Sequence, residues 1–371
     1  MSFCSNEISN FEYPLEEIER TRASAGLLTM EIEFSLRCNF NCPYCYVGNE
    51  DDFAGEMRVD EFKSTIQQAR ELGARKMIIL GGEPMIYPHL FDMIRYIRSL
   101  DMEVEMFTNG SRMSEENALE LYRNQVRVVL KMNTFDETLQ NKLSGIPNAY
   151  RIIQTAFENL KKAGYPDGKA EMAVSTIICQ QNIDELPDLW RWLRDRNILP
   201  YFEMITPQEN ALENDWLYVD SQRVHELFQQ LSEIDKTEYG HSWDPQPPLV
   251  GNRCLRHQFS CLVNAQGDVL PCVGVTLPVG NVRKTPLKQI LKESEVMQNL
   301  RNYKTTIKGE CGRCEKSDVC YGCRGTAYQL TGDYLASDPL CWKIQDEDRS
   351  SGSASTCSSR CFANNPKSSV A

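Results

Sequence analysis

The chain has 371 residues, 41% of them hydrophobic, which is enough to bury one large core and carry a smaller appended domain. Its formal net charge of −12 argues against a large phosphate-binding surface, because nucleic-acid affinity depends heavily on Lys and Arg. The N-terminus has no basic stretch followed by an apolar one, and no apolar run approaches the length that a bilayer requires. We therefore expect a cytoplasmic protein without a nucleic-acid or membrane partner.

Strand-like and helix-like segments alternate through the first half of the chain. Residues 29–36 are apolar at alternate positions and precede a loop with three cysteines, so they predict the first strand. Further strands are predicted at 76–80, 103–108, 127–132, 170–178 and 200–205, with helices at 59–73, 88–100, 114–124, 149–164 and 183–197. This α/β pattern predicts a parallel sheet with right-handed crossovers, either open or curled into an incomplete barrel.

The remaining segments suggest how the domains are divided. A helix predicted at 221–234 precedes the segment 241–248, whose three prolines favour an extended linker. The cysteine-rich part begins just after it, and the last residues are dominated by Ser. We predict an N-terminal extension (1–28), the sheet domain (29–206), a linker or helical bridge (207–253), a small cysteine-rich α+β domain (254–346) and a disordered tail (347–371).

The chain contains fifteen cysteines. A disulfide framework is typical of short exported chains, whereas the same abundance in a reducing compartment indicates metal binding. Three cysteines lie at 38–45 and eight between 254 and 341. Cys4, Cys357 and Cys361 fall near the termini, where incidental thiols are the simpler interpretation, although the tail pair could capture stray iron.

The first group has the spacing Cys38-x3-Cys42-x2-Cys45. Three thiolates can hold three corners of a cubane iron–sulfur cluster, and no fourth cysteine nearby completes the set. An open position on a metal centre is where substrate binds in catalytic sites. A zinc or structural iron site is the alternative.

Small and polar residues follow the later strands. Gly81-Gly82-Glu83-Pro84 follows the second strand; its glycines permit a close backbone approach to a ligand, Glu83 can accept from a cationic group, and Pro84 fixes the turn. An ordinary strand-to-helix turn is an equally good interpretation of this segment alone. A barrel-like sheet would gather such strand ends into one mouth.

Together these motifs resemble the radical S-adenosylmethionine (AdoMet) enzymes. The resemblance implies a partial (βα)6 TIM-like barrel, with Cys38, Cys42 and Cys45 holding a 4Fe–4S cluster whose open iron binds AdoMet. It also implies an external electron donor such as flavodoxin or ferredoxin. The positions carried over for AdoMet are Tyr44 near the adenine, Gly81, Gly82 and Glu83 at the amino group beside Pro84, and Lys131, Asn133 and Ser175 at the ribose or carboxylate.

The second group runs Cys254-x12-Gly267-x4-Cys272, then Cys311-x2-Cys314-x5-Cys320-x2-Cys323, and ends at Cys341. This pattern resembles the SPASM extension of radical AdoMet enzymes. Residues 261–264 and 269–272 are the arms of a predicted hairpin around Gln266-Gly267-Asp268. The resemblance implies two auxiliary 4Fe–4S clusters, with Cys254, Cys261, Cys272 and Cys323 as ligands of one and Cys311, Cys314, Cys320 and Cys341 as ligands of the other. Two zinc sites are the alternative.

Two departures from the family pattern matter. The last gap of the four-cysteine run holds two residues where three are common, so Cys320 and Cys323 could exchange between clusters. Val273 follows Cys272, where sulfatase-maturing relatives carry a catalytic aspartate, which puts formylglycine formation in doubt.

Three functions remain open from the sequence. Auxiliary clusters that remove an electron favour an oxidoreductase, by dehydrogenation or cross-linking. A redox-neutral epimerase would need a hydrogen donor, for which Cys179 is the candidate, and a non-catalytic metal or electron-transfer module is the third possibility. The short segment before the first strand leaves no room for a peptide-recognition domain, which favours a small molecule such as an aminoglycoside-like sugar or cyclitol, or a peptide delivered by a separate partner.

Overall fold

The computed structural model describes residues 13–47 and 55–344. The expectations for Cys4, Cys357, Cys361 and the tail lie outside these residues. Among the described residues, no helix has the length and apolarity needed to cross a membrane.

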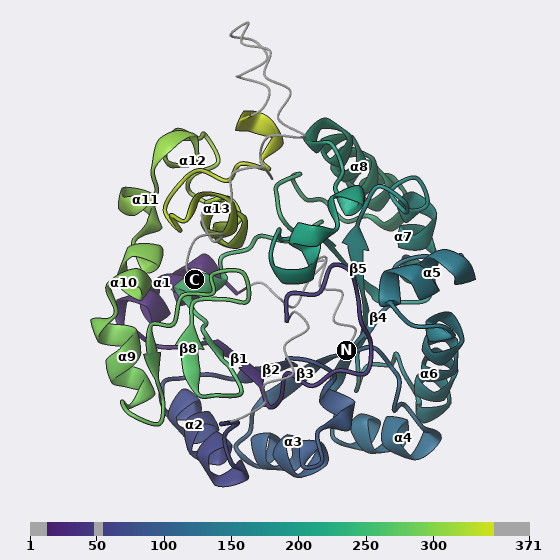
Figure 1. Ribbon diagram of the computed structural model, residues 1–371, viewed down its shortest axis with the longest axis horizontal. Helices are drawn as coiled ribbons and strands as arrows, with labels where there is room; N and C mark the ends of the chain where they lie inside the picture. The colour runs from purple at the N-terminus through teal and green to yellow at the C-terminus, as the bar shows by residue number, and fades with distance from the viewer. Residues whose placement is uncertain (1–12, 48–54, 345–371) are drawn as a thin grey trace, which may run out of the picture.

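One sheet organises the molecule (Figure 1). Its strands are β1 (Thr29–Glu33), β2 (Lys76–Leu80), β3 (Glu103–Thr108), β4 (Arg127–Lys131), β5 (Met172–Ile178), β6 (Leu199–Met204), β7 (Leu262–Val263), β8 (Asp268–Leu270) and β9 (Gly280–Asn281). The strand order is β6-β5-β4-β3-β2-β1-β7-β8-β9. Neighbours from β6 to β7 pair in parallel, and β8 and β9 are antiparallel additions at the β1 edge.

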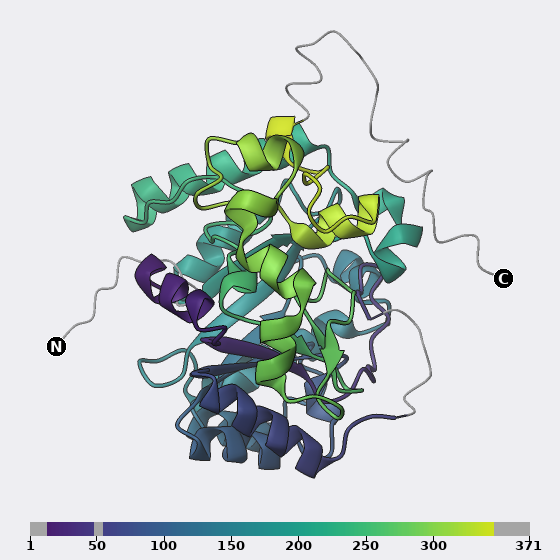
Figure 2. The same ribbon diagram turned by 90° about the vertical axis from the view of Figure 1, so that its left-hand side faces the viewer.

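Helices form an outer layer around this sheet, in the order α2, α3, α4, α6, α5, α7 and α8, with α9 to α12 on the side of β8 (Figures 1 and 2). They are α1 (Leu15–Ala23), α2 (Val59–Glu71), α3 (Leu90–Ser99), α4 (Glu115–Arg123), α5 (Glu137–Ser144), α6 (Ala149–Ala163), α7 (Leu186–Arg194), α8 (Ser221–Ile234), α9 (Leu287–Glu293), α10 (Glu295–Arg301), α11 (Tyr303–Thr306), α12 (Gly309–Arg313) and α13 (Arg324–Thr331). Side-chain caps define several starts: Ser114, Asp136 and Asp220 each accept a hydrogen bond from a backbone N–H in the first turn of α4, α5 and α8.

All six strands of the predicted parallel sheet are confirmed, with small differences at their ends. The first strand ends at Glu33, because the carbonyl groups of Ser35 and Arg37 accept from the N–H groups of Gly82 and Glu83 instead of continuing the ladder. The sequence did not predict α1 and α5, which are short and weakly periodic.

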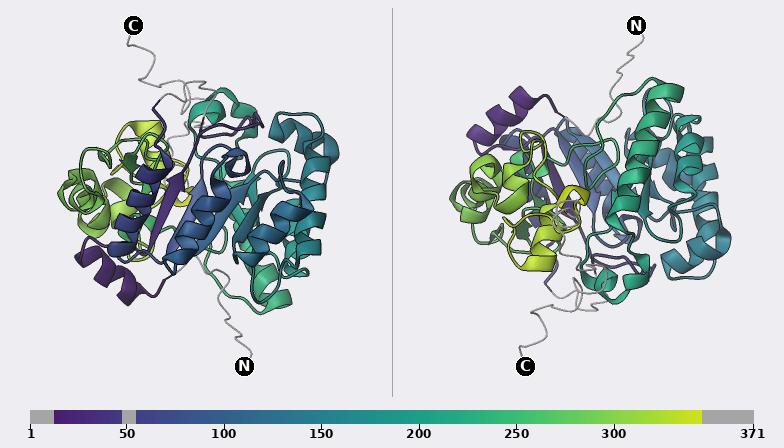
Figure 3. Two further views of the ribbon diagram at one scale, coloured as in Figure 1. Left: turned by 90° about the horizontal axis from the view of Figure 1, so that it is seen from below. Right: turned by 90° about the horizontal axis from the view of Figure 1, so that it is seen from above.

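The cysteine-rich part does not form a sheet of its own. Its predicted hairpin is present as β7 and β8, but β7 pairs directly with β1, so the hairpin extends the barrel sheet. At the far end, Trp342 stacks on His225 with ring centroids 4.9 Å apart and packs against Phe228 of α8. The cysteine-rich part, drawn in green to yellow in Figure 3, therefore extends from the β1 edge of the sheet to α8.

The inner face of the sheet carries charged side chains. On β1, Met30 and Ile32 pack in the main apolar core, whereas Thr29 and Glu31 line an interior cavity. Glu31 forms an ion pair of 2.7 Å with Arg256, and Glu105 of β3 forms one of 2.9 Å with Arg127. Polar residues at alternate positions of buried strands thus indicate a lined cavity rather than a packed barrel centre.

The predicted linker is docked on the barrel. Asp235, just after α8, is 0% exposed and accepts hydrogen bonds from the indole N–H groups of Trp190 and Trp243, at 2.7 and 2.8 Å. Arg194 of α7 donates two further bonds to the same carboxylate. The segment after α8 is therefore held to α7 by one buried carboxylate.

Replacing this carboxylate tests the attachment. Asp235→Asn removes the charge that compensates the buried Arg194, so we expect a loss of about 3 kcal/mol in unfolding free energy, measured by urea unfolding under anaerobic conditions. Asp184→Asn is the matched control, because the Asp184–Arg223 ion pair is largely exposed, and its loss should cost less than about 1 kcal/mol. Equal effects from the two variants would contradict this assignment.

Candidate metal and cofactor site

The three-cysteine loop lies at the C-terminal ends of the parallel strands. Cys38, Cys42 and Cys45 border one cavity of about 220 Å³. The other wall of this cavity comes from the ends of the later strands and includes Gly81, Gly82, Glu83, Asn109, Lys131 and Ser175. Burial, with a smaller contribution from the neighbouring Cys45, raises the pKa of Cys38 to about 11 and that of Cys42 to about 12.

The cysteine loop rests on glycine backbone rather than on side chains. A Cβ atom on Gly82 would lie 2.0 Å from the carbonyl oxygen of Arg37, and one on Gly81 would lie 2.5 Å from that of Ser35. On the other side of the loop, a Cβ on Gly145 would lie 1.7 Å from the carbonyl oxygen of Asn41. Gly81 and Gly145 also have positive φ angles of 110° and 69°. The close approach predicted for Gly81 and Gly82 is therefore made to the cysteine loop itself.

Glu83 is buried and accepts three hydrogen bonds from the protein. One carboxylate oxygen accepts from the Met85 N–H and the Thr108 hydroxyl, and the other accepts from the Asn109 N–H at 2.7 Å. Burial raises its pKa to about 7, and these three hydrogen bonds oppose the rise. Glu83 thus ties the end of β2 to the end of β3 and borders the cavity at the same time.

Tyr44, Lys131 and Ser175 form a second polar wall. The Lys131 ammonium donates to the Ser175 hydroxyl at 3.0 Å and lies 5.1 Å from the centre of the Tyr44 ring. Asn133 donates to the Tyr44 hydroxyl at 2.9 Å, but it is fully buried and does not line the cavity. Pro84 likewise starts a short 3₁₀ helix behind the cavity. The sequence-predicted AdoMet positions therefore divide into six that border the cavity and two, Asn133 and Pro84, that stand behind it.

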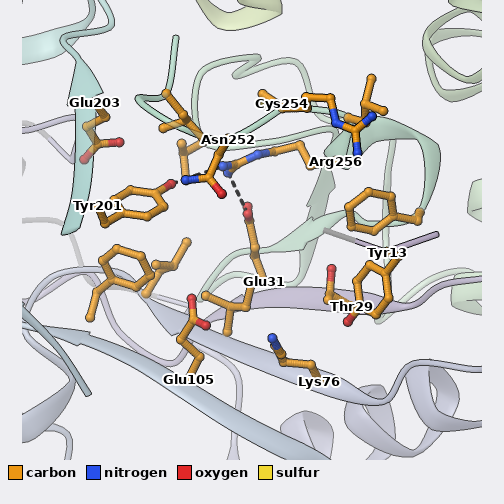
Figure 4. Close-up of a pocket in the computed structure, with 18 of the residues that line it drawn as sticks. Tyr13, Thr29, Glu31, Lys76, Glu105, Tyr201, Glu203, Asn252, Cys254 and Arg256 are labelled. Carbon is orange, nitrogen blue, oxygen red and sulfur yellow. Dashed lines mark hydrogen bonds and ion pairs between the residues drawn. The ribbon is translucent and has the colours of Figure 1, made fainter. Parts of the chain in front are cut away.

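A second cavity, of about 170 Å³, lies inside the barrel (Figure 4). Its labelled side chains come from several elements: Glu31 and Lys76 from β1 and β2, Glu105 from β3, and Arg256 and Cys254 from the cysteine-rich segment. Five residues border both cavities: Tyr46, Leu80, Phe107, Glu203 and Val273. The two cavities are therefore neighbours that share one wall.

Seven of the eight later cysteines gather in two groups. Burial raises the pKa of Cys272 to about 12 and also that of Cys323, with Cys254 adding to both, so Cys254, Cys272 and Cys323 form what we name the proximal group. Burial raises the pKa of Cys320 and of Cys341 to about 12, and Cys311 adds to both. With Cys314, which also acts on Cys320, these form the distal group: Cys311, Cys314, Cys320 and Cys341.

Asp338 lies between the two groups. It is 1% exposed, and its carboxylate accepts from the Cys323 N–H at 2.7 Å. Its own N–H donates to the Cys311 sulfur at 3.4 Å. One residue therefore contacts a member of the proximal group and a member of the distal group.

Two predicted positions lie elsewhere. Cys261 was expected among the proximal ligands, but it packs in the main apolar core, and the charged groups that act on its pKa are Arg301 and Glu31 rather than another cysteine. Cys179 is 0% exposed in an apolar cluster with Leu143 and Leu217, and it borders neither cavity. The candidate hydrogen donor Cys179 therefore faces neither cavity.

Comparison with known proteins identifies the class. The radical SAM superfamily profile matches residues 32–193, and the SPASM iron-sulfur cluster-binding domain matches residues 254–315. The chain is 26% identical over 335 residues to the AdoMet-dependent heme synthase of Methanosarcina barkeri, covering 83% of this chain and 94% of that protein. It is 27% identical over 351 residues to the PqqA peptide cyclase of Streptomyces rochei, covering 86% of this chain and 89% of that protein.

Solved structures share the fold. Streptococcus suis SuiB bound to S-adenosylmethionine superposes with a TM-score of 0.65 at 16% identity, covering 86% of this chain and 78% of SuiB. The AdoMet-bound enzyme anSMEcpe gives a TM-score of 0.65 at 17% identity, covering 91% of this chain and 98% of that one. The protein is a radical AdoMet enzyme with a C-terminal SPASM domain. Its cofactors are AdoMet and three 4Fe–4S clusters, one that binds AdoMet and two auxiliary.

The cysteine groups fit these cofactors. Cysteine binds iron as a thiolate, so coordination removes the thiol proton. The iron then supplies the positive charge that stabilises this buried thiolate in its apolar surroundings. The thiols of Cys38, Cys42 and Cys45 border the first cavity. The proximal group contains three further cysteines and the distal group contains four. In the part of the chain that the structure describes, no three His, Cys, Asp or Glu side chains converge on a single metal ion. We therefore propose the cysteines of these groups as the cluster ligands.

Several supporting residues were not predicted from the sequence. The side-chain nitrogen of Asn109 lies 3.8 Å from the Cys38 sulfur, and the segment Thr108-Asn109-Gly110 has ordinary turn composition. Gly145 follows α5 as a left-handed helix end, a common place for glycine, so its sequence context does not reveal the contact with Asn41. Such contacts between distant segments have no local pattern.

Gly145 provides a test of this support. We expect Gly145→Ala to lose about four iron atoms per chain after anaerobic reconstitution, because the added methyl group displaces the cysteine loop. Gly168→Ala is the control, since no atom lies within 4 Å of the methyl group that it would add. Iron and sulfide counts give the measurement, and full iron in Gly145→Ala would show that the loop tolerates the displacement.

Proposed function

We propose that this enzyme abstracts a hydrogen atom from a small polar molecule or peptide in the interior cavity and then oxidises the substrate. One observation carries the proposal. The interior cavity shares a wall with the cavity at Cys38, Cys42 and Cys45, and it is bordered on another side by Cys254 of the proximal group. A substrate held there lies between the site where AdoMet is expected and an auxiliary site that can accept an electron.

When bound, the cluster and AdoMet supply a 5′-deoxyadenosyl radical that takes the hydrogen atom. The chain's own residues position the substrate and exclude water. Tyr46 stands in the shared wall, where its hydroxyl donates to Glu33 at 2.8 Å, and Phe107 packs edge-on against Tyr201 at 5.4 Å. Such walls restrict the reactive species to one face of the substrate.

The polar lining supports a substrate that donates hydrogen bonds. Glu31 Oε2 and Glu105 Oε1 are buried carboxylate oxygens without a protein hydrogen-bond partner, and both residues line the interior cavity. An unpaired buried acceptor is costly, so these atoms favour a ligand with hydroxyl or amino groups. This supports a sugar-like or cyclitol-like molecule, or a polar side chain of a peptide.

The names of the relatives do not decide between a small molecule and a peptide as the substrate. One is named a heme synthase and another a peptide cyclase, so proteins with this level of similarity act on different kinds of molecule. The position of Cys179 gives no support to the epimerase hypothesis, because that thiol lies outside both cavities. Oxidation is therefore the reaction that the arrangement favours.

The proposal is tested by AdoMet cleavage. We expect the anaerobically reconstituted protein to form 5′-deoxyadenosine with dithionite, and to form it faster when an amino sugar or cyclitol substrate is added. Cys42→Ala should abolish this product, whereas Cys179→Ala should retain it. Liquid chromatography with mass spectrometry measures the product, and a C179A variant that loses substrate turnover but still cleaves AdoMet would favour the epimerase.

A second measurement separates oxidation from epimerisation. In deuterated buffer, an oxidised product should be lighter than the substrate by two hydrogens and should carry no deuterium at a carbon. An isomer of the substrate in which one carbon-bound hydrogen has been replaced by deuterium would contradict the oxidative reaction.

A further inference from the structure

The interior cavity has an unbalanced set of polar atoms. Three buried side-chain atoms of its lining have no hydrogen-bond partner, and all three are acceptors: Glu31 Oε2, Glu105 Oε1 and Asn252 Oδ1. Among the described residues that line this cavity, no buried donor atom lacks a partner. The three residues are 4%, 1% and 5% exposed. An unpaired acceptor at this depth is costly, so the cavity favours a ligand that donates hydrogen bonds without accepting them.

The register of the sheet places the two carboxylates in one row. Glu31 of β1 pairs with Ile78 of β2, and Ile78 pairs with Glu105 of β3. Residues in register across parallel strands project from the same face, and all three line the cavity. Figure 4 shows Glu31 and Glu105 facing the space that Asn252 also borders. Two strands apart, the backbones of the glutamates are separated by about 10 Å, which leaves room for a small ring over Ile78.

Each carboxylate is fixed in place through its other oxygen. Glu31 Oε1 accepts from Arg256 at 2.7 Å, and Glu105 Oε2 accepts from Arg127 at 2.9 Å. These ion pairs orient the carboxylates before any ligand binds. Arg127 also donates to Glu171 at 2.6 Å, so Glu105 shares its counter-ion with a second carboxylate. The site therefore combines oriented acceptors with a negative charge that one guanidinium does not fully compensate.

The cations that border the same cavity are already engaged. Besides its bond to Glu31, Arg256 donates to the Tyr201 hydroxyl at 3.4 Å. The Lys76 ammonium lies 3.7 Å from the carboxylate of Glu103, and Arg253 is not free either. An anionic ligand would have to displace one of these partners and would also meet unpaired carboxylate oxygens. The lining thus disfavours a carboxylate or phosphate on the substrate.

The chemistry of the donor group separates an amine from a hydroxyl. A hydroxyl donates one hydrogen and brings two lone pairs of its own, whereas a protonated primary amine donates three and brings none. Hydrogen bonds between an ammonium and a carboxylate are also stronger than neutral ones, and burial strengthens them further. An ammonium therefore matches this set of acceptors best.

We propose that the interior cavity binds the protonated primary amine of a small ring-shaped substrate, with Glu31 and Glu105 as the residues that select it and Asn252 as a third acceptor. This deepens the proposed function and rests on it, because the cavity is the one in which the substrate is placed. The ring occupies the space over Ile78, which Leu80 and Phe107 also border.

Binding of matched ring compounds provides the first test. Cyclohexylamine, cyclohexanol and cyclohexanecarboxylate share one ring and differ in one polar group. Isothermal titration calorimetry with the anaerobically reconstituted protein, AdoMet and no reductant measures their affinities without turnover. We expect the amine to bind at least about tenfold more tightly than the alcohol, and the carboxylate to bind most weakly. Equal binding of amine and alcohol, or no detectable binding of the amine, would overturn the amine site.

Substitution of the carboxylates provides the second test. Glu31→Gln and Glu105→Gln each remove one charge, so each should weaken cyclohexylamine binding about tenfold and leave cyclohexanol binding nearly unchanged. The alcohol thereby reports whether the cavity is intact. Glu238→Gln is the matched control, because this exposed carboxylate pairs with Arg191 at 2.7 Å away from the cavity, and it should change neither affinity. An unchanged ratio of amine to alcohol affinity in both cavity variants would contradict the assignment.

The amide of Nα-acetyllysine separates a ring from a peptide side chain. Its amine is carried on a flexible chain, which loses more conformational freedom on binding than a ring does, so we expect it to bind more weakly than cyclohexylamine. Tighter binding of the lysine derivative would assign the cavity to a basic peptide side chain and overturn the ring-shaped substrate.

The outcomes separate this inference from the proposed function. A preference for the amine in a protein that oxidises no amine would retain the site and reject the function. Oxidation of a neutral substrate by a protein without a preference for the amine would retain the function and reject the site.

Discussion

The contact between the cysteine loop and three glycines is the constraint on which the site depends. Residues 34–47, which follow β1, form neither helix nor strand, and the backbone carbonyls of Ser35, Arg37 and Asn41 lie close to where a Cβ atom on the facing glycine would stand. Hydrogen bonds from Gly82 and Glu83 then fix the start of the loop. Because the thiol positions follow from these backbone contacts, the strand ends and the metal site form one unit.

Buried hydrogen bonds between distant segments also hold the strand ends together. Glu83 connects β2 to β3 through Thr108 and Asn109, and Asn133 connects β4 to Tyr44 on the cysteine loop. Each of these residues is buried, so its hydrogen bonds are not exchanged with water. Residues that appeared to be candidate ligand contacts thus also hold the cavity walls in place.

The fold was largely predictable because strand periodicity is local. Segments such as 76–80 and 103–108 were predicted with the observed ends, and the cysteine spacing indicated both classes of cluster. The site was less predictable, because its supports join distant segments, as Gly145 does with Asn41. Cys261 shows the limit most clearly. The family resemblance implied that it is a ligand, but the register of the hairpin is one residue away from the symmetric one and places Cys261 on the core side of the strand.

The position of Asp338 has a consequence for assembly of the metal centres. Its carboxylate holds the Cys323 backbone and its own backbone holds the Cys311 sulfur, so the two auxiliary groups share one short connection. A local opening that releases one group must also disturb the other. The auxiliary clusters should therefore be loaded and lost cooperatively, as a pair, and a partly filled SPASM domain should be a minor species.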